Sequence, residues 1–140
     1  MMIQGCLHYR VWCHGWLLEE RQDTNLITDA GLTTLALGWA GDGDGVVTRI
    51  GFGSSPVDPT PDDANLLTPF VKPLTGYGSN PGAVVFLWDL LPMEANGLAI
   101  AEFGLFTEAE VLVARRIRES PLIKSSALYL RGSWTLSLAR

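Results

Sequence analysis

The sequence predicts a mainly β protein, an antiparallel β-sandwich or flattened barrel of about seven strands with one short α-helix. Three observations favour this fold class. Apolar and polar residues alternate in many short segments, most regularly over residues 128–138. Turn-forming Gly, Pro, Asn, Asp and Ser residues separate those segments. Only residues 28–39 have the apolar spacing of an amphipathic helix.

The N-terminal segment predicts a β-hairpin. Residues 7–13 alternate apolar with polar side chains, the pair His14-Gly15 supplies the turn, and residues 16–21 return as a second strand. We therefore expect two parts in the chain, an N-terminal hairpin over residues 1–24 and a β domain over residues 25–140.

A single helix is predicted after the hairpin. Thr28 or Asp29 is a suitable N-cap, and Gly41 or Gly43 can end the helix. The apolar face of the helix is expected to consist of the residues at helical spacing, which are Leu32, Leu35, Ala36 and Trp39.

Further strands are expected over residues 46–53, 67–77, 83–91, 98–106, 111–118 and 126–140. Pro69 and Pro73 cannot donate to a sheet ladder, so their strand is expected at an edge. The strands at residues 83–91 and 98–106 are apolar on both faces. This pattern predicts a second packed layer or a partner chain.

Three tryptophans are candidate partner contacts. Trp12 and Trp16 lie in the predicted hairpin, and Trp88 lies in a strand that is apolar on both faces. Tryptophan is enriched where proteins meet. We expect the hairpin, with Trp12 and Trp16, to be a docking element.

Composition excludes several classes of function. The chain has 140 residues, 47% of them hydrophobic and 18% charged, which predicts one folded domain with a real core. Its net charge of −5 argues against nucleic-acid binding, because no basic excess is available to neutralise phosphates. No segment has the length of a membrane span or the pattern of a signal peptide. We expect a protein made in a cytosol that uses no membrane.

Cys6 and Cys13 lie close to His8 and His14, which raises the question of a metal site. In an extended strand the two cysteines are on opposite faces, on the order of 23 Å apart. This separation excludes a disulfide between them and a four-ligand zinc site. Cys6, His8 and His14 share a face, so a ring of histidines around an oligomer axis stays open. We expect no metal and no cofactor.

The carboxylates offer one catalytic alternative. Asp89, Glu94 and Glu102 could pair as general acid and base, as in a small glycosidase or lyase. The other interpretation of Glu102 is a structural charge, because a buried carboxylate must be paired. Asp42 and Asp44 have part of the spacing of a calcium loop, but the remaining ligands are missing. We expect a structural Glu102 and no enzymatic activity.

Five segments in a fixed order are similar to the attachment domain of bacteriophage tail-collar fibre proteins. They are a helix start, a glycine-containing strand, a leucine after a Pro/Thr/Asp loop, a strand of the form I-x-E-x-G-L-F and a late lysine. The residues that match are Ile27, Thr28, Ala30, Gly31, Ile50, Gly51, Gly53, Leu66, Ile100, Glu102, Gly104, Leu105, Phe106 and Lys124.

The resemblance implies a virion structural protein that attaches tail fibres to a baseplate or tail tip. Its implied partners are other tail or baseplate proteins, a fibre protein and further copies of itself, with a trimer favoured. Together with the residue patterns, it predicts Lys124 or Arg49 as the charge partner of Glu102. The rival from another class is a carbohydrate-binding receptor-recognition module of a phage tail, with tryptophans stacking on sugars.

Overall fold

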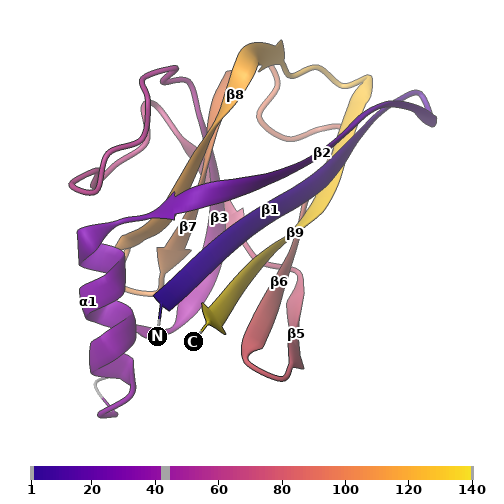
Figure 1. The fold of residues 1–140 in the computed structure, drawn as a ribbon. Coiled ribbons are helices and arrows are strands. Elements are labelled where there is room, and N and C mark those ends of the chain that lie inside the picture. The colour runs from indigo at the N-terminus through magenta and orange to yellow at the C-terminus, as the bar shows by residue number, and fades with distance from the viewer. Residues whose placement is uncertain (1, 42–44, 140) are drawn as a thin grey trace.

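The computed structural model describes residues 2–41 and 45–139, and this part of the chain contains nine strands and one helix (Figure 1). The elements are β1 Met2–Cys13, β2 Trp16–Ile27, α1 Asp29–Gly38, β3 Val47–Gly53, β4 Phe70–Pro73, β5 Gly76–Asn80, β6 Ala83–Leu90, β7 Ala99–Thr107, β8 Leu112–Ile123 and β9 Leu128–Ala139. The predicted mainly β class is confirmed. More strands form than expected because residues 67–77 divide into β4 and β5.

All nine strands belong to one antiparallel sheet in the order β4-β3-β7-β8-β2-β1-β9-β6-β5. The sheet curls into a half-barrel, so its two halves face each other. The join between the halves is short, because β2 and β8 pair only at Leu26–Arg115 and Ile27–Ala114. β4, which contains Pro73, lies at one edge, as the missing N–H predicts.

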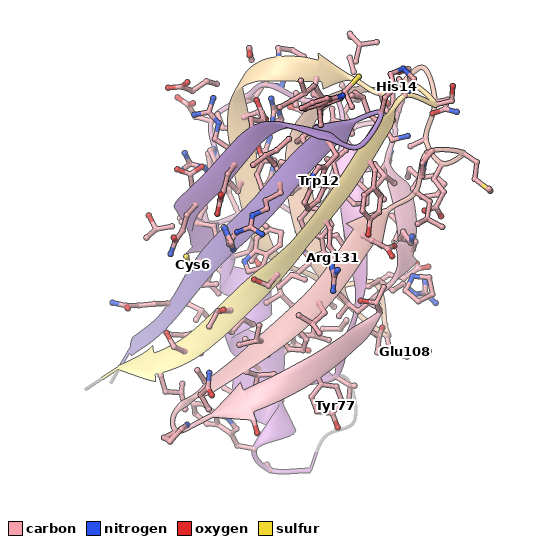
Figure 2. All side chains as sticks on the ribbon, turned by 90° about the vertical axis from the view of Figure 1, so that its right-hand side faces the viewer. Cys6, Trp12, His14, Tyr77, Glu108 and Arg131 are labelled. Atoms are coloured by element: carbon pink, nitrogen blue, oxygen red, sulfur yellow. The ribbon has the colours of Figure 1, made fainter. Side chains whose placement is uncertain are left out.

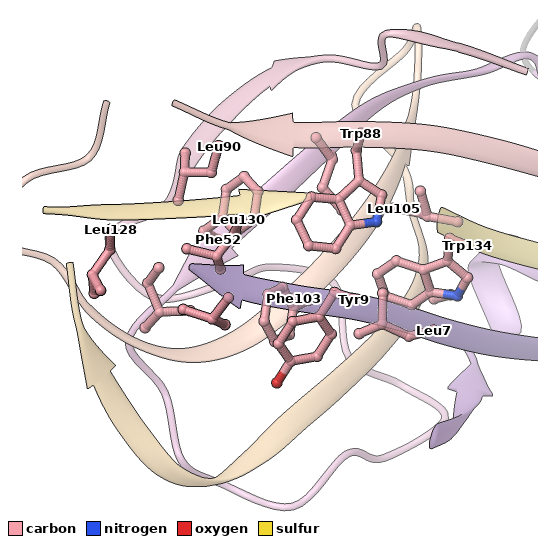
Figure 3. Packing of buried hydrophobic residues seen from close by; sticks show 14 of the residues in the cluster. Leu7, Tyr9, Phe52, Trp88, Leu90, Phe103, Leu105, Leu128, Leu130 and Trp134 are labelled. Atoms are coloured by element: carbon pink, nitrogen blue, oxygen red, sulfur yellow. The ribbon is translucent and has the colours of Figure 1, made fainter. Parts of the chain in front are cut away.

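The core fills the space between the two halves of the sheet (Figure 3). Tyr9 from β1 lies 4.9 Å from Phe103 of β7, and Trp88 from β6 lies 5.5 Å from Phe52 of β3, measured between ring centroids. Aromatic pairs at these separations add to the hydrophobic stabilisation. The expectation that Trp88 is a partner contact is therefore wrong. Its side chain is 1% exposed, because the opposite layer of this chain covers its face of β6.

The N-terminal hairpin forms as predicted, but it is not a separate unit. β1 pairs with β9 along its whole length, from Met2–Ala139 to Cys13–Leu128. It also places Leu7, Tyr9 and Val11 in the core. The expected boundary at residue 24 does not divide the fold. β1 lies inside the sheet and is paired with β2 on one side and with β9 on the other.

Helix α1 begins as predicted at the N-cap Thr28, whose hydroxyl accepts a hydrogen bond from the N–H of Gly31 at 2.9 Å. Its buried residues are Gly31 and Thr34, and not the expected apolar series. A Cβ at residue 31 would lie 2.6 Å from the carbonyl oxygen of Val113, so the helix touches β8 through its backbone. Trp39, at the C-cap, is 67% exposed as a result.

Cys6 and Cys13 are both free thiols. Within residues 2–41 and 45–139, no helix is long and apolar enough to cross a membrane.

Candidate functional site

Glu102 lies in the middle of β7 and is completely buried. One carboxylate oxygen, Oε1, accepts a hydrogen bond from Nε of Arg115 at 2.8 Å. The other, Oε2, accepts from the backbone N–H groups of Ser55 at 2.9 Å and Leu67 at 2.8 Å. Burial of a charge requires such partners. Glu102 therefore fastens both ends of the long loop between β3 and β4 to the sheet.

Arg115 extends this cluster into the same loop. Its Nη1 donates to Oδ2 of Asp63 at 3.0 Å and its Nη2 donates to the carbonyl oxygen of Ser55 at 3.4 Å. Burial raises the pKa of Asp63, but hydrogen bonds from Thr60 and Arg115 outweigh this effect and hold that pKa below its usual value. The ion cluster consists of the buried Glu102 and Arg115 and the half-buried Asp63, and it connects β7, β8 and the loop.

The predicted charge partners of Glu102 are wrong. Lys124 is buried elsewhere, where its Nζ donates to the carbonyl oxygens of Pro92 and Ser125 and to Oδ1 of Asn96 at 3.0–3.1 Å. Burial lowers the pKa of Lys124. Arg49 is half-exposed and lies 3.7 Å from Glu110.

Arg115 is the partner because of the register between β7 and β8. Gly104 pairs with Arg115 and Glu102 pairs with Ile117, so the arginine lies diagonally across from the carboxylate. One signal in the sequence points to Arg115 as a buried charge. Arg115 shares a strand face with Val113 and Ile117, and an arginine on an apolar face needs a buried acidic partner.

The catalytic alternative requires a pair of neighbouring carboxylates. Asp89 and Glu94 are neighbours, but they share a lysine, and Glu102 has a separate set of partners. Glu102 is enclosed by its donors, whereas Asp89 and Glu94 both bind Nζ of Lys72 at 2.6 Å. Burial raises the pKa of Glu94, but hydrogen bonds from Lys72 and from the N–H of Leu91 outweigh this and keep that pKa below its usual value. A general acid needs the opposite shift.

The metal alternatives concern His, Cys and Asp side chains. Among residues 2–41 and 45–139, no group of three or more His, Cys, Asp and Glu residues is arranged to hold an ion. His8 contacts Oε1 of Glu20 at 2.8 Å on the exposed face of the hairpin. The half calcium loop, Asp42 and Asp44, lies outside the described residues.

An apolar groove lies at the end of the molecule where α1 and both chain termini gather (Figure 1). Its volume is about 450 Å³. The lining comes from the C-terminal part of α1, the start of β1 and β3, and strands β6 and β9, and includes Ile3, Leu35, Trp39, Val46, Phe86 and Leu138. None of the lining residues that the structure describes is charged. We call this surface the end groove.

The tip of the β1–β2 hairpin lies at the opposite end of the molecule (Figures 1 and 2). Trp16, Leu17 and Leu18 follow the turn and are 78%, 52% and 58% exposed. Trp12 is half-buried and stacks on Tyr129, with 5.5 Å between the ring centroids. Of the three candidate contact tryptophans, Trp16 is thus the one that presents most of its surface. We call Trp16, Leu17 and Leu18 the hairpin tip.

Comparison with protein-family models, with curated proteins and with solved structures gives no match to this chain.

Proposed function

We propose that this protein is a bacteriophage virion structural protein, a tail-fibre or fibre-adaptor subunit that attaches fibres to the baseplate or tail tip. The observation that carries the proposal is the way the motif residues of the tail-collar resemblance meet in space. Three of the five segments, which contain Gly53, Leu66 and Glu102, meet in one buried region, whereas Lys124 lies elsewhere. A shared fold requires such a region, whereas chance matches have no reason to converge.

Gly53 and Glu102 are the clearest case. They are paired across β3 and β7, and a Cβ at residue 53 would lie 2.4 Å from Oε2 of Glu102. The glycine of one motif therefore makes room for the glutamate of another. Leu66, the motif leucine, is 7% exposed and packs with Phe106 of the glutamate strand.

The exposed surface also supports an assembly role. The end groove and the hairpin tip are apolar surfaces at opposite ends of the molecule, and such patches commonly mark protein contacts. In this proposal the protein acts through surface complementarity with other tail proteins and with its own copies, a trimer being the favoured state.

Virion composition tests the proposal. Phage particles released by the bacterial strain that carries the gene are purified, separated into heads and tails, and analysed by quantitative mass spectrometry. The expected result is this protein in the tail fraction at a fixed ratio to the other tail proteins. Deleting its gene should give particles without fibres in electron micrographs. Absence of the protein from washed particles, with unchanged fibres after deletion, overturns the proposal.

A carbohydrate-binding module is the second candidate, favoured by the stacked pair Trp12 and Tyr129. With His14 and Ser126 they line a hollow of about 490 Å³, which combines aromatic faces with polar groups. Glycan-array binding that is lost in Trp12→Ala and kept in Tyr77→Ala would support this function. Tyr77 is 77% exposed on the edge strand β5 and serves as the control.

A further inference from the structure

We propose that the fork between β2 and β8 binds a small oxyanion of the phosphate type. The fork is formed by residues 16–25 of β2 and residues 116–123 of β8. Three features support the site, which are an excess of arginines, a buried donor without a partner and a small polar pocket. This binding site goes beyond the proposed function and does not depend on it.

The fork exists because β2 and β8 are neighbours in the sheet but separate after a short join. They pair only at Leu26–Arg115 and Ile27–Ala114, and no further backbone pairing joins them within the described residues. Beyond the join β2 continues along β1 and β8 continues along β7, so the two strands diverge (Figure 1). Side chains, instead of main-chain hydrogen bonds, therefore bridge this part of the sheet.

Charged side chains line the fork on the face that is turned toward the core. Glu19, Arg21 and Asp23 of β2 lie directly opposite three buried residues of β1. Arg116 of β8 lies opposite a buried phenylalanine of β7, and Arg118 shares its face by alternation. Residues that are directly opposite each other in an antiparallel pair lie on the same face of the sheet. These five charges are therefore gathered on one side of the fork.

The five charges are three cations and two anions, and one cation has no counter-charge. Nη1 of Arg118 donates to Oε1 of Glu19 at 2.6 Å, and Nη2 of Arg116 lies 3.4 Å from Oδ1 of Asp23. Arg21 lies between the two acidic residues along β2. Its side chain forms no ion pair or hydrogen bond within residues 2–41 and 45–139. The fork thus has one positive charge that an anion can neutralise.

Arg116 also has a donor that the fork leaves unsatisfied. Its Nη1 donates to the carbonyl oxygen of Thr24 at 3.1 Å, but its Nε is buried and has no hydrogen-bond partner among the described residues. A buried donor without a partner costs free energy, so an acceptor at this position is stabilising. A water molecule would accept from Nε, but only an anion would also neutralise Arg21.

A small polar pocket of about 90 Å³ lies in the fork. All three arginines and Tyr9 line it, whereas its acidic residues are Asp23, which already pairs with an arginine, and the exposed Glu119. The hydroxyl of Tyr9 accepts from Nη1 of Arg118, so its own hydrogen can be donated to another acceptor. Pockets for drug-sized ligands have volumes of about 300–1,000 Å³. The size and the donors therefore suit a single small oxyanion.

Titration with potassium phosphate at neutral pH tests the site, with NMR spectra of the isotope-labelled full chain as the measurement. Potassium chloride at matched ionic strength is the control. We expect phosphate to give saturable shifts of the amide signals of residues 116–120 and of the Nε–H signal of Arg116, with a Kd of about 1 mM or tighter. Shifts that equal those in chloride, or that saturate only outside the fork, would overturn the inference.

Arg21→Gln is the decisive variant, because it removes the cation without a counter-charge and leaves the ion pairs of Arg116 and Arg118 in place. Arg131→Gln makes the same change at an exposed arginine of β9 outside the pocket, and it is the matched control. We expect Arg21→Gln to bind phosphate at least about tenfold more weakly than the wild type, and the control to bind like the wild type. Circular dichroism checks that both variants are folded. Equal affinities in the two variants would contradict the assignment.

A titration with glycerol phosphate, with glycerol as its control, identifies the source of the oxyanion. An affinity similar to that of inorganic phosphate indicates a phosphate group carried by a larger molecule, and binding of inorganic phosphate alone indicates the free ion. The virion assay keeps this site apart from the proposed function. Phosphate binding by a protein that is absent from virions overturns the phage function alone, and a tail protein that binds no phosphate overturns the oxyanion site alone.

Discussion

Replacing Glu102 with glutamine tests the ion cluster directly. The substitution keeps the size and shape of the side chain but replaces a carboxylate oxygen with an NH₂ group. In the structure one oxygen faces Nε–H of Arg115 and the other faces the N–H groups of Ser55 and Leu67. Whichever way the amide turns, its NH₂ faces a donor, and Arg115 loses its buried counter-charge.

The expected cost follows from the burial of both partners. The side chains of Glu102 and Arg115 are 0% and 3% exposed, so solvent cannot replace the lost partner, and only Asp63 still pairs with the arginine. Removing one partner of a buried pair costs about 3–5 kcal/mol. A domain of this size has a free energy of unfolding of about 5–15 kcal/mol, so the loss is a large share of the total. We expect the melting temperature to fall by roughly 10 °C or more.

Urea unfolding followed by tryptophan fluorescence measures the change, with Glu110→Gln as the matched control. Glu110 faces Arg49 at 3.7 Å and its side chain is 81% exposed, so the same chemical change there should alter stability by less than about 0.5 kcal/mol. Limited proteolysis should also cut the loop of residues 54–69 faster in Glu102→Gln than in the control.

Two results would refute the reasoning about Glu102. One is a Glu102→Gln protein as stable as Glu110→Gln. The other is a polysaccharide-hydrolysing activity that Glu102→Gln abolishes while the protein stays folded, because a structural charge has no part in turnover.

Three further predictions follow from the fold. Gly53→Ala should lower the free energy of unfolding by about 1–3 kcal/mol in urea titrations, because the new Cβ meets the buried carboxylate, whereas Gly78→Ala, with nothing within 4 Å of its Cβ, should not. An equal loss of stability in Gly53→Ala and Gly78→Ala would contradict this packing. Removing strand β1 should leave a chain without cooperative thermal unfolding, and a cooperative transition would restore the hairpin as a separate unit. Stability should fall as pH drops below about 4.5, because the pKa values of Asp63 and Glu94 are lower in the folded state than in the unfolded chain. Their contribution is fully present above the unfolded pKa and is lost on acidification, so a urea midpoint that rises toward pH 3 would contradict it.

Several features were predictable from short stretches of sequence. Alternation over residues 7–13 and the pair His14-Gly15 predict the hairpin, and Thr28 predicts the helix start. These signals are local, because periodicity, turn conformation and capping depend on residues a few positions apart. The structural interpretation of Glu102 also agrees with its burial, since an isolated carboxylate within an apolar run needs compensation.

The partners of the charges could not be read from the sequence. Glu102 pairs with Arg115 because of the register of β7 and β8, and Arg115 reaches Asp63 across 52 residues of chain. Lys124 and Arg49 were equally suitable by charge alone. Only the return of the loop across the sheet brings Asp63 to Arg115.

By itself the sequence determined the kinds of element and the face of each strand that is apolar. The tertiary structure alone decided which apolar faces are covered, as Trp88 and Trp16 show. Trp88 is enclosed by the opposite layer (Figure 3), whereas Trp16 is 78% exposed. The physical reason is that a side chain loses contact with water only when a distant segment packs over it, and this depends on the curl of the whole sheet.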